Sequence, residues 1–271
     1  MKEQFRDHGG ILDHIPIAGR IKRQFDIDIG ELGVQQTFAK WVAVAGEGKL
    51  SIRGKDDHVK EILREKPVVV IGNHPSFAEI LTVAASLEPR DDMYGIGISL
   101  FLGIGPNMSK HVFPVYKTRQ MFREQQKLLV RVGYILHLGP RIRPDEAHKK
   151  NIESISQAAD AVRKGSLVGI FPEGIRSGKN SKWSNGVGHL LLGIGKGSNG
   201  YLIFVYSDGV SNWDYLRVVP GIKKLIPPVS VTFAKPRTIA DALEESTDPR
   251  EITRKLQEEY NNWVSSIGKG L

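Results

Sequence analysis

The sequence predicts an α/β fold: a mainly parallel central sheet flanked by helices, with an N-terminal helical segment. Short continuous apolar runs, typical of parallel strands buried on both faces, alternate with segments of helical periodicity from residue 49 onwards. The 271 residues suit one large α/β domain, alone or with a small helical appendage. Polar clusters directly follow two of the apolar runs, where open α/β sheets bind their ligands.

The expected elements alternate along the chain as they do in parallel sheets. Strands are expected at 50–53, 68–72, 93–98, 111–116, 167–171, 201–206 and 229–233. Helices are expected at 30–45, 77–87, 119–134, 151–164, 186–193 and 249–267, whereas residues 1–30 follow no clear pattern. We therefore divide the chain into an N-terminal helical segment, 1–46, which is a candidate for membrane association, and an α/β domain with a C-terminal helix, 47–271.

Two apolar segments each leave two interpretations open. In the expected helix 30–45, one broad face holds Leu32, Phe38 and Trp41. This face either packs on the body of the protein, which its modest amphipathicity favours, or faces a membrane. Residues 95–108, rich in glycine and apolar side chains, either dip into lipid or form a buried strand followed by a packed turn.

Composition narrows the classes of function. The absence of cysteine excludes disulfides, thiolate–zinc sites and cysteine nucleophiles. The formal net charge of +8 fits an anionic partner, although it also fits a basic protein in which charge has no role. No stretch reaches the roughly 18–20 apolar residues that cross a bilayer, and the polar segment Met1–Asp13 does not resemble a signal peptide. We expect a protein that is soluble or lies on a membrane without crossing it.

The first polar cluster follows the expected strand 68–72 and begins with Asn73 and His74. On one continuous helix His74 and Glu79 would point apart, but across a strand-to-helix turn Glu79 can fold back to the imidazole. The carboxylate would then set the tautomer and make the other ring nitrogen a general base. The alternative is a helix cap, with Asn73 or Ser76 as the N-cap and Glu79 beside the helix dipole.

The second cluster, residues 171–177, reads F-P-E-G-I-R-S and follows the expected strand 167–171. Pro172 and Gly174 favour a tight turn that presents Glu173 and Arg176 at the mouth of the sheet. An arginine there suits bidentate recognition of a phosphate. The alternative is a surface turn with one ion pair.

Together, and in this order, the clusters resemble the lysophospholipid and glycerol-3-phosphate acyltransferase superfamily, over about residues 48–239. The second differs from the family block F-P-E-G-T-R-S only at Ile175, and the first matches N-H-x4-D except that Glu79 replaces the aspartate. A further block, often I-P-V-D-R, is F-P-V-Y-K at 113–117, where Lys117 stands in the arginine position. Arg119 is an equal candidate for that cation.

The resemblance implies transfer of a fatty acyl group from acyl-CoA or acyl-carrier protein to a hydroxyl of a phosphate-bearing glycerolipid precursor, lysophosphatidate or glycerol 3-phosphate. His74 would be the general base and Glu79 its carboxylate partner, with no metal or other cofactor. The substrate-binding residues would be Lys117, Arg119, Glu173, Gly174, Arg176 and Ser177. Of these, Arg176 with Lys117 or Arg119 would hold the phosphate, and Glu173 would order the site or bind an acceptor hydroxyl.

The resemblance also implies a cytoplasmic enzyme, peripheral on the inner face of an anionic membrane and without a transmembrane helix. Two alternatives remain: an acyltransferase acting on a glycolipid or acylated amino acid, and a non-catalytic peripheral lipid-binding protein. The charge alone would allow a nucleic-acid-binding protein, but the sequence has no recognition helix or aromatic–basic array, so we expect no nucleic-acid partner.

Overall fold

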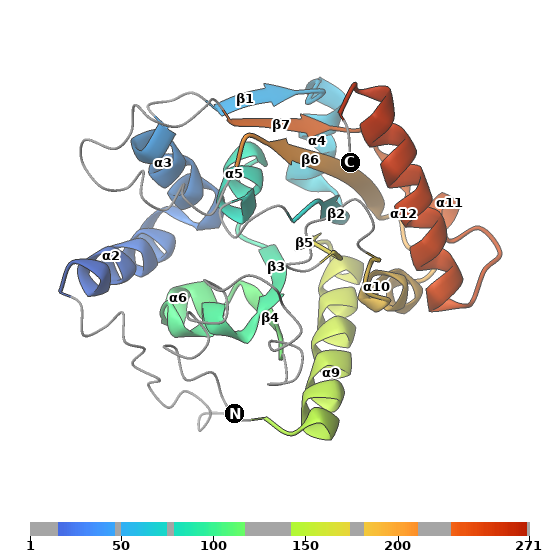
Figure 1. Ribbon diagram of the computed structural model, residues 1–271, viewed down its shortest axis with the longest axis horizontal. Helices are drawn as coiled ribbons and strands as arrows, with labels where there is room; N and C mark the ends of the chain where they lie inside the picture. The colour runs from blue at the N-terminus through green and yellow to red at the C-terminus, as the bar shows by residue number, and fades with distance from the viewer. Residues whose placement is uncertain are drawn as a thin grey trace.

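The computed structural model describes residues 16–46, 50–74, 79–116, 142–173, 182–210 and 229–269. These residues form an eight-stranded sheet in the order β1-β7-β6-β2-β5-β3-β4, with β8 paired to β6 (Figure 1). The strands are β1 (Leu50–Arg53), β2 (Val68–Gly72), β3 (Met93–Ile98), β4 (Val112–Val115), β5 (Leu167–Ile170), β6 (Tyr201–Asp208), β7 (Val229–Phe233) and β8 (Arg237–Thr238).

The sheet is mainly parallel, as predicted. Among the described strands only the pairings of β6 with β7 and β8 are antiparallel. The centre is β2, an uninterrupted apolar run that is buried along its whole length between β5 and β6. Such a run suits a strand covered by helices on both faces.

Helices cover both faces (Figure 1). Towards one face lie α2 (Pro16–Leu32), α3 (Val34–Gly46), α4 (Asp57–Glu65), α5 (Glu79–Ser86) and α6 (Pro106–Ser109), with the short 3₁₀-helix η1 (Ser99–Gly103). Towards the other lie α9 (Pro144–Arg163), α10 (Gly186–Ile194), α11 (Ile239–Leu243) and α12 (Pro249–Ser266). Each helix buries one apolar side against the sheet or a neighbouring helix, so the core consists of two clusters separated by the strands.

The expected helix 30–45 is wrong at its start. Gly33 adopts a positive φ of 81° and separates α2 from α3, and a positive φ is accessible mainly to glycine. Leu32 therefore ends α2 with an exposed side chain, whereas Phe38 on α3 is buried in the core. The face proposed from Leu32 to Trp41 does not exist as one surface, and the part on α3 packs on the body of the protein.

Other boundaries differ less. Strands β3 and β7 have the predicted bounds, but α9 begins at Pro144, two turns before the expected start, because Pro144 at its first turn favours helix initiation. The unpredicted α4 is capped by Asp56, whose side chain accepts the Val59 N–H. The expected helix 119–134 lies outside the described residues.

The N-terminal helices pack closely on the domain. Phe38 joins the same buried cluster as β2, and the Trp41 indole donates to buried Asp28 at 2.8 Å. Asp26 on α2 accepts the Met108 N–H of α6 at 2.8 Å. Met108 is buried, so α6, at the end of segment 95–108, is anchored on the domain by this residue. None of the described helices is long and apolar enough to cross a bilayer.

Candidate active site

His74 and Glu79 meet at the carboxyl end of β2. His74 follows the strand after one intervening residue, and Glu79 opens α5. The His74 Nδ1 contacts the Glu79 Oε1, and the histidine is 7% exposed while the carboxylate is fully buried. An ionised carboxylate can only accept, so when Glu79 is ionised Nδ1 carries the shared proton and Nε2 is left to accept one. The contact predicted across the strand-to-helix turn is therefore present.

Asn73 fixes this turn to the neighbouring strand. Its amide Nδ2 donates to the Ser207 carbonyl oxygen at 2.9 Å, and its Oδ1 accepts the Ser207 N–H at 2.8 Å. Thr82 on α5 reaches the same serine, with 3.2 Å between the two hydroxyl oxygens. The Asn73 side chain thus ties β2 to β6 and does not serve as a helix cap. The other proposed cap, Ser76, lies outside the described residues.

Glu173 lies directly behind His74. Its Oε2 accepts the backbone N–H of His74 at 3.4 Å, although it belongs to the second motif, at the end of β5. Burial raises the pKa of Glu173, and the His74 N–H and the nearby Trp183 indole partly oppose that rise. The Trp183 Nε1 is buried without a hydrogen bond of normal geometry among the described residues, so the indole acts on Glu173 by its proximity. Glu173 thus joins the two sequence motifs.

The proposed phosphate-binding residues Lys117, Arg119 and Arg176, together with Gly174 and Ser177, lie outside the described residues. The residue before Lys117 is described, however. Tyr116 donates its N–H to Asn151 Oδ1 at 2.6 Å and accepts from Asn151 Nδ2 at 3.0 Å. Asn151, on α9, therefore fixes the backbone of the F-P-V-Y-K block, 113–117, just before Lys117. Sequence reasoning missed it, because an asparagine within a helix carries no signal of a distant partner.

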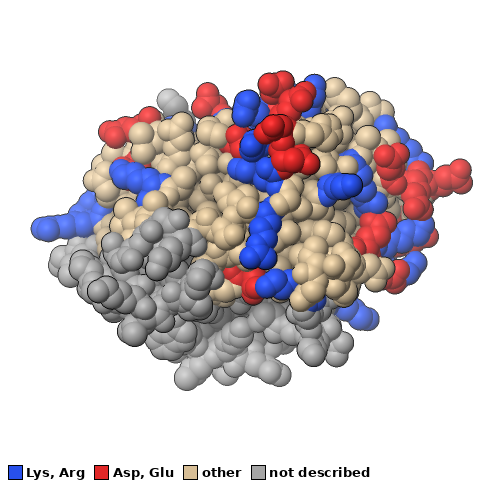
Figure 2. All heavy atoms as spheres, turned by 90° about the horizontal axis from the view of Figure 1, so that it is seen from above, with Lys and Arg blue, Asp and Glu red and all other residues tan. Residues whose placement is uncertain are grey.

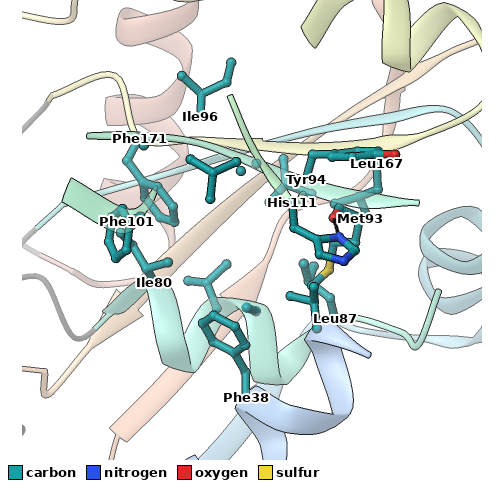
Figure 3. Close-up of a pocket in the computed structure, with 18 of the residues that line it drawn as sticks. Phe38, Ile80, Leu87, Met93, Tyr94, Ile96, Phe101, His111, Leu167 and Phe171 are labelled. Carbon is teal, nitrogen blue, oxygen red and sulfur yellow. Dashed lines mark hydrogen bonds between the residues drawn. The ribbon is translucent and has the colours of Figure 1, made fainter. Parts of the chain in front are cut away.

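An apolar cavity begins beside His74. The Phe171 ring lies 5.8 Å from the His74 ring, measured between centroids, and forms part of the cavity wall. The cavity, of about 70 Å³, lies between the sheet and helices α3 and α5. Figure 3 shows Phe171, Phe101 and Ile80 near one end and Leu87, Met93 and His111 near the other. The His111 Nδ1 bonds the Met93 carbonyl oxygen at 2.9 Å, which fixes the ring in the wall.

No cluster of three or more His, Asp or Glu side chains that could hold a metal ion occurs among the described residues. On the face shown in Figure 2, Lys and Arg side chains alternate with Asp and Glu. The described part of this face therefore does not carry a single-sign patch.

Comparison with known proteins identifies the class. The family model described as Acyltransferase matches residues 54–204, more than half of the chain and both ends of the His74–Glu79 pair. The chain therefore belongs to the acyltransferase family, and acyl transfer is its reaction class.

Among solved structures, it is similar to the crystal structure of the 1-acyl-sn-glycerophosphate (LPA) acyltransferase PlsC from Thermotoga maritima, with 12% identity, a TM-score of 0.46, and 87% of this chain and 82% of that chain covered. No curated protein sequence matches the chain significantly.

Proposed function

We propose that the protein transfers a fatty acyl group from acyl-CoA or acyl-carrier protein to a hydroxyl of a phosphate-bearing glycerolipid precursor, either lysophosphatidate or glycerol 3-phosphate. The observation that carries this proposal is the buried His74–Glu79 pair at the carboxyl end of β2, beside an apolar cavity. A general base next to an apolar cavity suits transfer of a fatty acyl chain to an alcohol.

The reaction follows from the tautomer of His74. Nε2 takes the proton of the acceptor hydroxyl while its oxygen attacks the thioester carbonyl carbon. Glu79 stabilises the resulting imidazolium through Nδ1. The tetrahedral intermediate then collapses, the C–S bond breaks, and His74 returns the proton to the departing thiolate. No covalent acyl-enzyme is required.

The other residues divide between the two substrates. The donor's acyl chain enters the apolar cavity, whose wall begins at Phe171 beside the base. The acceptor's phosphate is held by Arg176 with Lys117 or Arg119, and Gly174 and Ser177 complete that side of the site. Glu173, through the His74 N–H, keeps the backbone of the base in position.

The direct test is His74→Ala. Loss of a general base should lower kcat about 100- to 10,000-fold, while circular dichroism and the melting temperature stay close to the wild type. His189→Ala is the matched control, because that histidine is exposed on α10. Near-normal turnover by a folded His74→Ala protein would exclude the mechanism.

The identity of the acceptor requires a panel. Purified protein is incubated with an acyl thioester and with glycerol 3-phosphate, lysophosphatidate, a glycolipid or an acylated amino acid, and products are identified by mass spectrometry. Product from the first two supports the proposal, whereas product from the last two alone assigns the other acceptor class. No thioester consumption with any acceptor would favour a non-catalytic lipid-binding protein.

We further propose that residues 1–46 dock reversibly on an anionic membrane at the cytoplasmic inner face, while residues 47–271 form the acyltransferase domain. Most of the exposed large apolar side chains of the described residues lie on α2 and α3, namely Ile21, Ile27, Leu32 and Val44. Basic residues held near an anionic surface would add about 1 kcal/mol each.

Vesicle co-sedimentation tests the docking. Binding to anionic vesicles should weaken with salt and be largely absent with neutral vesicles. The double variant Ile27→Ser with Val44→Ser should bind more weakly, whereas Ile152→Ser, an exposed isoleucine on α9, should not. Equal binding to neutral and anionic vesicles would show that the basic residues do not contribute to docking. No binding to either kind of vesicle would reject membrane docking.

A further inference from the structure

Glycines line the face of the sheet that borders the cavity, and they differ in what lies over them. A Cβ added at Gly72 would meet the Phe171 ring at 2.8 Å, and one at Gly97 would meet the Phe101 ring at 3.0 Å. At Gly95, by contrast, a Cβ would have no atom within 4 Å, and at Gly169 only the Tyr94 carbonyl oxygen, at 3.9 Å. Aromatic rings thus fill the space above the first pair, while the second pair faces open space.

Gly95 and Gly169 are also neighbours. They are register partners on β3 and β5, so the two missing side chains leave one continuous gap in the floor of the cavity. Neither has a positive φ that would require glycine. A glycine within a strand costs stability, and without a local backbone or packing reason it commonly marks the close approach of a ligand.

The gap lies in the middle of the cavity. Residues two apart on a strand point to the same face, so the Phe171 position lies about 7 Å from Gly169 on the side of His74. Met93 and Leu167, a register pair, lie about 7 Å from the gap in the opposite direction and are both buried. In Figure 3, Leu87 and Met93 gather at that end, while Ile96 points away from the cavity.

We propose that Gly95 and Gly169 determine which acyl chains the enzyme accepts, by leaving the passage along which the donor's chain crosses the floor of the cavity. The inference rests on the proposed acyl-transfer function. The occupant is the donor's chain because its thioester carbonyl must lie at His74, where the cavity begins. The Met93–Leu167 pair sets the far end of the chain.

A side chain placed in the gap should separate long chains from short ones. Gly95→Leu would close the passage on the side of Phe171 that is away from His74. A hexyl chain, which ends before this point, would still fit, whereas the distal part of a dodecyl chain would lose its burial. Each methylene denied burial weakens binding about fourfold. We therefore expect Gly95→Leu to reduce dodecyl affinity at least about tenfold and to leave hexyl affinity nearly unchanged.

The experiment measures binding apart from turnover. S-dodecyl and S-hexyl thioethers of pantetheine, the group shared by both donor types, cannot transfer their chains, and they are titrated into the full chain by calorimetry. The wild type should bind the dodecyl thioether more tightly, and Gly95→Leu should lose this preference. Gly197→Leu is the control, because that exposed loop glycine also has no atom near its Cβ but lies outside the cavity wall.

Each outcome decides a separate point. Equal dodecyl affinity in the wild type and Gly95→Leu overturns the inference, as does a wild type that binds neither thioether. A wild type that binds with the expected preference but consumes no acyl thioester keeps the inference and overturns the proposed function. If Gly95→Leu does not fold, the double variant Gly95→Ala with Gly169→Ala, which adds two methyl groups into open space, should shift the preference in the same direction.

Discussion

The two faces of the central sheet differ in how completely they are filled. Towards α10 and α12, Tyr260 is fully buried with its ring centroid 5.3 Å from Phe204 and 5.6 Å from Trp263, and its hydroxyl donates to the Val205 carbonyl oxygen at 3.0 Å. Towards α3 and α5, the face instead keeps the Gly95–Gly169 gap and an apolar cavity. Protein interiors are normally packed as densely as organic crystals, so the unfilled face is where we propose that the donor's acyl chain binds.

The comparison assigns stability to one face and chemistry to the other. The filled face holds the C-terminal helix, so removing a large side chain there should weaken the whole fold. The open face ends at His74 and Glu79, so changes there should alter activity or chain preference with little effect on stability. The following substitutions test that division.

The largest effect is expected from Tyr260→Ala on the filled face. Removing a fully buried aromatic ring should lower the free energy of unfolding by about 3–5 kcal/mol, measured by urea denaturation. Tyr260→Phe removes only the hydroxyl and should cost about 1 kcal/mol. Because the Tyr260 hydroxyl also lies near Glu173 and the Asn73 backbone, the kcat/KM of Tyr260→Phe tests the division directly, and a stable but inactive Tyr260→Phe protein would contradict it.

Glu79→Gln should have the next largest effect, on activity rather than stability. The amide keeps the size of the side chain but cannot stabilise the imidazolium, so we expect kcat to fall about 100-fold or more. Glu79→Asp, which restores the aspartate of the family motif N-H-x4-D, should retain part of the activity. Steady-state kinetics separate the two variants. Full activity of Glu79→Gln would reduce Glu79 to a structural residue at the start of α5.

Glu173→Gln should change stability in a way that depends on pH. Burial raises the pKa of Glu173, so the unfolded chain ionises at lower pH than the folded protein. Folding therefore loses stability as the pH rises above the ordinary carboxyl pKa of about 4.3, until the folded carboxyl is also ionised.

Glutamine does not ionise, and its amide oxygen can still accept the His74 N–H. Glu173→Gln should be more stable than the wild type at neutral pH and equally stable at pH values well below the carboxyl pKa. Urea denaturation across this range provides the test. A difference in stability that stays constant with pH would show that the charge of Glu173 is not responsible.

The smallest effect is expected from Gly169→Ala on the open face. The methyl group enters open space, so restricting the unfolded chain should raise the free energy of unfolding by about 0.5–1 kcal/mol. Gly97→Ala is the matched control, because its Cβ would press on the Phe101 ring at 3.0 Å and should not stabilise. If both alanines act alike, the space above Gly169 is not empty in the folded protein.

Much of the fold could be predicted because its signals are local. The apolar run 68–72 predicts a buried strand, and the polar residues that follow it predict a site at its carboxyl end. The His74–Glu79 contact was also predictable, because the two residues are only five positions apart and the chain itself brings the two groups together. By contrast, the break at Gly33 was missed, since helical periodicity continues across it, although Gly33 has a positive φ and α2 packs against α6 through Asp26.

The sequence by itself determined which groups the proposed mechanism can use: a histidine, a carboxylate and no cysteine. Tertiary structure alone decided what surrounds that base. The Asn73–Ser207 and Asn151–Tyr116 pairs join residues 134 and 35 positions apart, and no local pattern encodes such partners. The cavity likewise depends on two glycines from different strands falling in register, which follows from the order and alignment of the strands. Periodicity reports which way a side chain points, whereas the empty space above Gly95 and Gly169 depends on every element that packs around it.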